Sequence, residues 1–234
     1  MTYNHTARFI GRPTPHRRII TGRRDCFTGE LPSTKEAMGF RMVAWEGIVC
    51  RDMLIRTDYD KQVVEYQEEP APFPWYDGKI FRRYYPDAIK MLKDGRRIVM
   101  EAKRLNVVQK RGLKEVYKLV ELGALEAGYD GFELWTEAET HVGPDLVNAN
   151  LIRSEATSRT TNESHLHTMR STLLKLGGRA TIRQLRHASG IGDQAYRTVL
   201  RLLFLQEFDF RPSWKEIDDH SEIVWSSAGE RGDE

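Results

Sequence analysis

The pattern of hydrophobic and polar positions along the first 150 residues predicts strands and helices in mixed order. Apolar runs bounded by turn residues predict strands at residues 40–45, 63–66, 80–92, 97–101 and 131–136. Helices are expected at residues 46–57 and 110–127, where the second segment has apolar side chains at helical spacing and a glycine after its end. Helix, antiparallel strands, helix and strand in this order predict an α/β fold with a mixed sheet flanked by helices.

A different pattern follows residues 153–162, a polar stretch that has no apolar period and is expected to be a linker. Three helical segments are predicted at residues 165–176, 181–188 and 193–206, and two short strands at 208–210 and 223–225. Helix, helix, a glycine-containing turn, helix and a β-ribbon are typical of a small winged-helix domain. The predicted parts are a basic arm (1–33), an α/β domain (34–152), a winged-helix domain (163–226) and an acidic tail (227–234).

Charge adds to this picture mainly through its distribution. The 234-residue chain has a formal net charge of +2, yet residues 1–24 contain six arginines and no acidic residue. Such an arm, with Arg17 and Arg18 as candidate contacts, suits a phosphate backbone or an acidic partner surface; the alternative is a frayed basic terminus. The sequence has no apolar run of transmembrane length, no secretory signal and only two cysteines, so we expect a soluble cytoplasmic protein that binds no membrane.

The candidate chemistry lies at Asp87, which follows Pro86, and at Glu101 and Lys103 on a later predicted strand. Hydrolysis of a phosphodiester needs a hard divalent cation, which prefers oxygen ligands. Asp87 and Glu101 are the candidate metal ligands, and the backbone carbonyl of Ala102 is a plausible third. The expected cofactor is Mg²⁺ or Mn²⁺, which acidifies a bound water that Lys103 orients or deprotonates. The alternative is that these charged residues are simply solvated.

The length of the loop around Asp94-Gly95 decides whether the candidate residues share one face of the hairpin. A two-residue loop would set Asp87 opposite Ala102 and leave Glu101 and Lys103 on the other face of the strand. A three-residue or bulged loop shifts the register by one residue and brings the three side chains together. If the site exists, we therefore expect a bulge or a three-residue turn.

Basic residues dominate the predicted helices of the second domain. From residue 165 to 205 the chain contains seven arginines and lysines against one acidic residue, Asp193. Candidate contacts to double-stranded DNA are Gln194, Arg197 and Arg201 on the third helix, together with Arg183 and Arg186 on the second. The alternatives are a protein-docking module and a merely solvated basic face.

Several motifs of the first domain occur in the order typical of one nuclease family. They are Trp45-Glu46, the segment 58–66, Glu69-Pro70, Asp77-Gly78, Tyr85-Pro86-Asp87, Asp94-Gly95 and Glu101-Ala102-Lys103. On these residues the chain resembles the TnsA-type endonuclease subunits of heteromeric transposases, within the PD-(D/E)xK superfamily of restriction-endonuclease-like folds. The resemblance implies cleavage of one DNA strand at transposon ends. It also implies two partners, an integrase-type transposase and an ATPase regulator.

Two departures from that family concern its helix glutamate, a metal ligand in a Ser-x-x-Glu setting upstream of a Gln-Pro. The corresponding positions are Gly47 and Cys50 here, and the Gln-Pro is Glu69-Pro70. A neutral thiol contributes almost nothing to Mg²⁺ binding. If the helix already includes Glu46, this carboxylate lies one turn earlier on the same face and can substitute for it; the alternative is that Glu46 only caps the helix.

Three functions remain open at the level of sequence. The first is an active metal-dependent DNA endonuclease of a transposition system, with Asp87, Glu101, Lys103 and Glu46 as catalytic candidates. The second is a catalytically impaired nuclease fold that acts as a DNA-binding or architectural protein, for which Cys50 is the argument. The third is a stand-alone restriction or repair nuclease.

Overall fold

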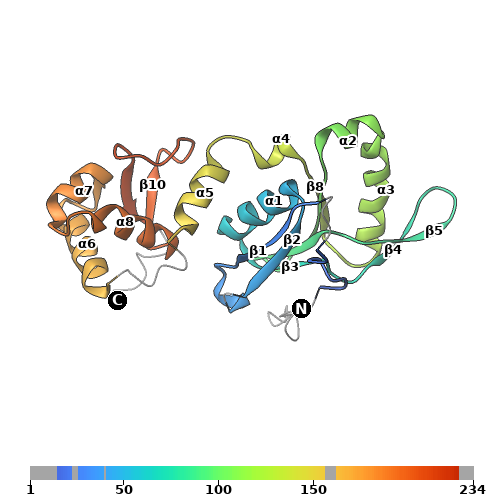
Figure 1. Cartoon of the computed structure of the whole chain (residues 1–234), viewed down its shortest axis with the longest axis horizontal. Helices are drawn as coiled ribbons and strands as arrows, with labels where there is room; N and C mark the ends of the chain where they lie inside the picture. The colour runs from blue at the N-terminus through green and yellow to red at the C-terminus, as the bar shows by residue number, and fades with distance from the viewer. Residues whose placement is uncertain (1–14, 23–25, 40, 156–161, 227–234) are drawn as a thin grey trace. The chain divides into compact units, whose positions relative to one another are not determined.

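The computed structural model describes residues 15–22, 26–39, 41–155 and 162–226 (Figure 1). The chain divides into two compact units, Met1–His141 and Val142–Glu234, each of which is described by itself below. The division at His141 lies earlier than the predicted end of the first domain at residue 152. Helix α5 (Asp145–Arg153) belongs to the second unit because Asn148 binds the backbone of residues 215 and 217.

The first unit is built around a mixed four-stranded sheet, in agreement with the predicted α/β class. Its strands, in spatial order, are β3 (Val63–Glu68), β6 (Ala88–Leu92), β7 (Arg97–Ala102) and β8 (Gly131–Trp135). The first two pairings are antiparallel, and β7 pairs with β8 in parallel. The parallel pairing requires a crossover, which helices α2 (Leu105–Lys110) and α3 (Leu113–Glu126) supply.

Helices pack on both faces of this sheet. On one face, Ile89 and Val99 form a buried cluster with Tyr117 and Val120 of α3. On the other face, Met100 of β7 accepts a hydrogen bond from Thr57 of helix α1 (Ile48–Tyr59). Successive residues of a strand point to opposite faces, so Glu101 lies on the same face as Val99, toward α3.

Two short antiparallel pairs flank the central sheet. Strands β1 (Thr28–Pro32) and β2 (Met42–Glu46) form one pair, with the 3₁₀ turn η1 (Glu36–Met38) between them. Strands β4 (Phe73–Tyr76) and β5 (Phe81–Tyr84) form the other. The short helix α4 (Glu137–Thr140), capped by Thr136, ends the unit.

These short strands correct two predictions. The strand expected over residues 80–92 is two strands, β5 and β6, that belong to different sheets, because the segment around Pro86 carries the chain from one sheet to the other. The arm expected to reach residue 33 contains β1, whose Gly29 lies so close to Trp45 that an added Cβ would be 2.5 Å from its ring. The buried Ile19 also attaches residues 15–22 to the unit.

The second unit combines helices α5, α6 (Glu163–Lys175), α7 (Ile182–Ser189) and α8 (Gln194–Phe204) with a small antiparallel sheet. The order of its strands is β10 (Phe208–Arg211), β11 (Glu222–Trp225) and β9 (Arg179–Thr181). The predicted helices and the β10–β11 ribbon are confirmed, whereas β9 was not predicted. Its last residue, Thr181, caps α7 through a capping box with Gln184.

Two predicted segments lie partly or wholly outside the described residues. The linker expected at residues 153–162 begins inside α5, and residues 156–161 are not described. The predicted acidic tail, residues 227–234, is likewise outside the described part of the chain. Every helix in the described ranges is too short or too polar to cross a lipid bilayer.

Candidate active site

The β6–β7 hairpin has the register that the candidate site requires. Ala88 lies opposite Met100 and Met91 opposite Arg97, while the amide of Leu92 donates to the carbonyl of Arg96 across a three-residue loop. The expected three-residue turn is thus confirmed. Continued by one residue, this register sets Asp87 opposite Glu101, and a carboxylate oxygen of Asp87 accepts a hydrogen bond of 2.8 Å from the amide of Ala102.

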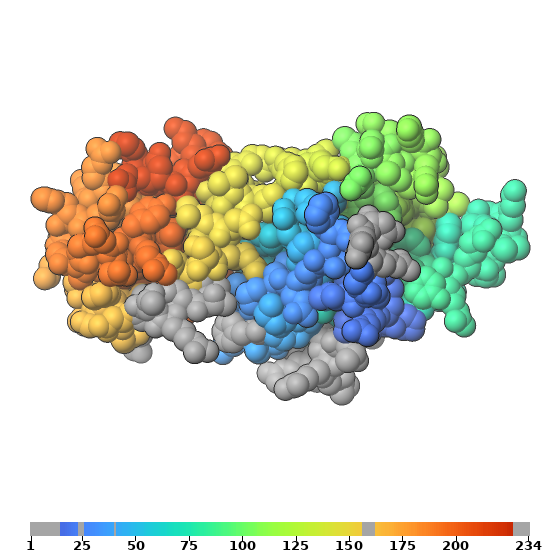
Figure 2. Space-filling model, viewed as in Figure 1, coloured from blue at the N-terminus to red at the C-terminus, as the bar shows by residue number. Residues whose placement is uncertain are grey.

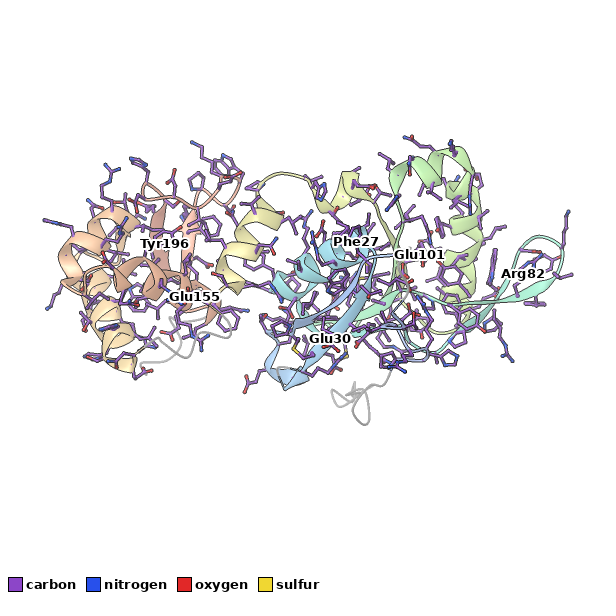
Figure 3. The ribbon with its side chains drawn as sticks, in the orientation of Figure 1. Phe27, Glu30, Arg82, Glu101, Glu155 and Tyr196 are labelled. Carbon is purple, nitrogen blue, oxygen red and sulfur yellow. The ribbon has the colours of Figure 1, made fainter. Side chains whose placement is uncertain are left out.

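The side chain of Glu101, labelled in Figure 3, is buried, and only one of its two carboxylate oxygens accepts a hydrogen bond from a described residue. Its Oε1 is 3.0 Å from Nζ of Lys103 and accepts a hydrogen bond of 3.3 Å from the hydroxyl of Tyr117. Its Oε2 is buried and accepts no hydrogen bond from the residues that the structure describes. A buried carboxylate oxygen without a partner costs free energy, so this atom is suited to a further ligand such as a cation.

The negative charge of Glu101 disfavours the ionised form of Asp87. Loss of solvation and the negative charge of Glu101 raise the pKa of Asp87 to about 8, although the Ala102 amide and the Lys103 ammonium act in the opposite direction. For Lys103, burial lowers the pKa, but the charges of Glu101 and Asp87 outweigh it and the net shift is upward. Without a metal, Lys103 is therefore a cation that can orient a water or a phosphate rather than a base.

One cavity of about 330 Å³ in the first unit is lined by three of the four predicted catalytic groups; Glu101 is the one that does not line it. Its lining includes Glu46, Cys50, Asp87, Ala102 and Lys103. The backbone amide of Lys103 is bound to the carbonyl of Trp135, which holds the end of β7 against β8. Residues from a strand end, a helix start and a hairpin thus meet around a space large enough for several waters or a phosphate group.

These residues fit a hard divalent cation with few protein ligands. Among the described residues no group of three or more His, Cys, Asp and Glu side chains is arranged to hold a metal ion. The donors on hand are the carboxylates of Asp87 and Glu101 and the Ala102 carbonyl, all oxygen atoms. Such a short set is compatible with Mg²⁺ because this ion keeps several of its waters when it binds protein.

The expected position of Glu46 on the first helix is wrong. Glu46 is the last residue of β2, and α1 starts at Ile48. Gly47 between them has φ +86°, a left-handed conformation that ends the strand and prevents the helix from including Glu46. Glu46 still lines the cavity, but from the strand rather than from one helical turn before Cys50.

Cys50 lies where the resemblance would place a metal-ligating glutamate. The residue is buried on α1 and lines the cavity beside Asp87. Burial, then the negative charge of Asp87, raises the pKa of its thiol well above the ordinary range. The thiol is therefore neutral and does not replace a carboxylate as a ligand for Mg²⁺.

An ion-pair network at the cavity uses a residue that we predicted to contact DNA. Arg17 pairs with Glu46 at 2.7 Å and with Glu69 at 2.5 Å. These carboxylates raise the pKa of the Arg17 guanidinium further, and the hydrogen bond that Arg17 donates to Glu69 is the largest contribution. Arg17 thus neutralises the carboxylate that was expected to replace the helix glutamate.

Glu69 is a site residue that the sequence analysis did not select. It is buried, its φ of +42° is unusual for a residue with a side chain, and its amide donates to the carbonyl of Asp87 at 2.8 Å. Its charge contributes to the raised pKa of Asp87. The available signal was an acidic residue before Pro70, where the resemblance inferred from the sequence would place a glutamine.

In the second unit, three of the predicted DNA contacts have intramolecular partners. Arg197 pairs with the buried Glu155 at 2.9 Å, and Arg201 donates to the Glu155 backbone carbonyl at 2.8 Å. Arg186 pairs with Asp219 at 2.8 Å. Sequence reasoning missed Glu155 because it lies 42 residues before Arg197, at the edge of the predicted linker.

The remaining predicted DNA contacts are exposed. Gln194 lies at the start of α8 and Arg183 on the first turn of α7, both solvent-exposed. Arg18 in the first unit is exposed as well. Each of these side chains is accessible to a ligand by itself, whereas Arg186, Arg197 and Arg201 would have to exchange or share carboxylate partners.

Comparison with protein-family models finds no match to this sequence, and comparison with curated proteins finds no match either.

Proposed function

We propose that the chain is a metal-dependent DNA endonuclease subunit that cuts one strand at transposon ends. The observation that carries the proposal is the hairpin register, which sets Asp87 opposite Glu101. Lys103 lies 3.0 Å from Glu101, and Asp87 and Lys103 line one cavity. The proposal includes a restriction-endonuclease-like fold for the first unit and a winged helix for the second. The mixed sheet between helices and the order of α6, α7, α8 and the β-ribbon support these assignments.

In this proposal Asp87, Glu101 and the Ala102 carbonyl hold Mg²⁺ or Mn²⁺. When bound, the ion supplies a water of lowered pKa and offsets negative charge on the phosphate. The Lys103 ammonium, held 3.0 Å from Glu101, orients the attacking water along the scissile bond. The Arg17 guanidinium adds a fixed positive charge at the cavity wall, and Glu69 keeps that guanidinium in place.

Recognition of DNA in this proposal uses the exposed residues Arg18, Arg183 and Gln194 first. Arg186, Arg197 and Arg201 join them only if phosphates displace Asp219 and Glu155. Partners would be an integrase-type transposase, which cuts the other strand, and an ATPase regulator. Double-stranded DNA is the proposed substrate. We expect water to attack the phosphorus from the side opposite the leaving oxygen, and the product to carry a 5′-phosphate.

The second candidate function is an impaired nuclease fold that binds DNA or partners without cutting. Two observations favour it: the neutral, buried thiol of Cys50 at the expected ligand position, and the pairing of Glu46 with Arg17. Both remove a carboxylate from the metal site. Asp87 and Glu101 still repel each other at this site, which favours the active enzyme, because an unused site gains nothing from such an arrangement.

Titration calorimetry with Mn²⁺ distinguishes the two functions without requiring a partner protein. We would compare the wild type with Asp87→Ala and Cys50→Glu. Binding by the wild type that disappears in Asp87→Ala supports the endonuclease, and cleavage of labelled duplex DNA with the partner transposase then tests it directly. Absence of binding in the wild type, with binding in Cys50→Glu, supports the impaired fold.

A further inference from the structure

The β4–β5 hairpin projects from the first unit beyond helix α3 (Figures 1 and 2). In the described part of the chain its two strands pair with each other and not with the central sheet. The base of the hairpin is fixed, because Phe73 and Trp75 pack in the cluster formed with α3. An added Cβ at Gly123 of α3 would be 2.5 Å from Cβ of Trp75, which shows how closely helix and hairpin approach.

The two faces of this hairpin differ in character. The pairs Phe73–Tyr84 and Trp75–Arg82 share the face that packs on the unit, whereas Pro74–Arg83 and Tyr76–Phe81 share the other. On this outer face the side chain of Phe81 is 72% exposed, and its ring lies 5.4 Å from that of Tyr76. Ile80, in the adjoining turn, is 55% exposed. Large apolar side chains gathered at a projecting tip indicate an interaction surface.

The charge of the tip is positive. Lys79, Arg82 and Arg83 are exposed, and the sequence from 70 to 86 contains one acidic residue, Asp77. Asp77 is already engaged: it accepts hydrogen bonds of 2.9 Å from the turn amides of Lys79 and Ile80 and pairs with Arg82 (Arg82 is labelled in Figure 3). These bonds also preorganise the turn. Exposed aromatic and apolar side chains between exposed cations match nucleic acid better than a protein surface.

The hairpin continues directly into the candidate active site. Phe81 is six residues before Asp87, a chain length that spans at most about 20 Å, or about six base pairs of a duplex. Tyr84, the last residue of β5, is three residues before Asp87, so the base of the hairpin adjoins the candidate site. A duplex with one phosphate bound at the cavity would therefore be long enough to reach the hairpin tip.

We propose that the hairpin tip, residues 76–83, inserts into the minor groove of duplex DNA beside the cleavage site. Ile80 and Phe81 enter a base step as an apolar wedge, and Lys79 and Arg83 contact the flanking phosphates. Side chains of this kind partially unstack a step and bend the duplex. This inference rests on the proposed function, because it assumes that the substrate is double-stranded DNA.

The test measures binding and bending in a protein that does not cut. The full-length Asp87→Ala chain, without divalent metal, is mixed with a mixed-sequence duplex labelled at both ends for energy transfer. Adding Phe81→Ala should weaken binding by about ten- to one-hundred-fold and abolish bending. Leu122→Ala is the matched control, since Leu122 is an exposed apolar residue of α3, and it should change neither quantity.

A second variant tests the phosphate contacts. Adding Arg83→Ala should reduce the slope of log affinity against log salt by about 0.9, as expected for one lost phosphate contact. Circular dichroism confirms that the variants fold; both altered side chains are exposed.

Equal binding and equal bending with and without Phe81 would overturn the inference, as would absence of duplex binding by the Asp87→Ala parent. The second result would direct the tip to a protein partner. Failure of the proposed nuclease function can be distinguished from failure of the hairpin inference. A wild type that never cuts, yet bends DNA through Phe81, would keep the hairpin assignment. Cleavage and binding that ignore Phe81 would keep the nuclease and remove the wedge.

Discussion

Like charges lie next to each other in the carboxylate pocket of the first unit, whereas opposite charges are paired on the basic helices of the second. In the pocket, Asp87 and Glu101 face each other, and the pKa of Asp87 rises to about 8 as a result of burial and of that neighbour. On the helices, Arg186 and Arg197 are matched with Asp219 and Glu155. An arrangement that costs stability suggests a binding task, whereas a matched ion pair is sufficiently explained by folding.

A charged residue therefore indicates a binding site in one region and only a structural ion pair in the other. A basic residue on a predicted helix suggested DNA contact, but the structure provides an acidic partner from a distant segment. The carboxylates of the pocket have Lys103 and the Ala102 amide as partners, and one oxygen of Glu101 still lacks a hydrogen bond from any described residue. Unsatisfied charge, rather than charge alone, distinguishes the candidate site.

The largest expected effect is on catalysis itself. Lys103→Ala should lower the rate of DNA cleavage by about 10²–10⁴-fold, and Asp87→Ala should remove cleavage altogether, while duplex binding stays within a few-fold of wild type. The measurement is single-turnover cleavage of labelled duplex with Mg²⁺ and the partner transposase. Lys118→Ala, an exposed lysine of α3, is the control. Cutting by either pocket variant at the wild-type rate would show that the site is assigned wrongly.

The next effect concerns stability against pH in the metal-free protein. The folded chain keeps a proton on Asp87 up to about pH 8, whereas the unfolded chain releases it near 3.8, so stability should fall as the pH rises between these values. Asp87→Asn should reduce this loss in the free energy of unfolding by about 2 kcal/mol. This figure is smaller than the full pKa shift implies because the half-buried side chain is partly screened by solvent.

Urea unfolding at pH 5 and pH 8 measures this change, with Asp94→Asn as a control that should keep the decline. Saturating Mn²⁺ at pH 8 should restore stability to the wild type by about 2–3 kcal/mol and leave Asp87→Asn unchanged. Parallel curves for the wild type and Asp87→Asn would mean that the two carboxylates do not repel each other as the pocket indicates.

A smaller effect is expected at Arg17, where the pocket contains its own matched ion pairs. Arg17→Ala removes a positive charge and frees Glu46 and Glu69, so Mn²⁺ affinity measured by calorimetry should rise by about ten-fold. Arg18→Ala removes the same charge from an exposed neighbour outside the cavity lining and should have little effect. Weaker Mn²⁺ binding in Arg17→Ala would instead make Arg17 a support of the metal site.

The smallest effect is expected on the basic helices. Glu155→Gln removes the carboxylate that pairs with Arg197, so the affinity for duplex DNA should rise a few-fold and the salt slope should steepen by about 0.9. Fluorescence anisotropy across a salt series measures both. Glu163→Gln is the control in the same unit, because Glu163 pairs with Arg170 instead. Unchanged DNA binding in Glu155→Gln would identify the α8 arginines as structural.

Much of the fold was accessible from the sequence because it depends on local signals. Alternating and helical apolar spacing located β3, β7, β8 and α3 to within a few residues, and Gly and Asp residues marked the turns. The three-residue loop after β6 followed from a geometric argument about which strand face Asp87, Glu101 and Lys103 must share. The separation of β5 from β6 was missed, since one continuous apolar pattern covers both strands.

By itself, the sequence determined the class of the fold, the strand ends that carry Asp87, Glu101 and Lys103, and the oxygen-rich chemistry of these residues. Only the tertiary structure decided that Arg17 binds Glu69, 52 positions away, that Glu46 belongs to a strand, and that Glu155 holds Arg197. The physical reason is the range of the forces involved. Turn and strand preferences act between neighbours in the chain, whereas ion pairs depend on which distant segments packing brings within about 4 Å.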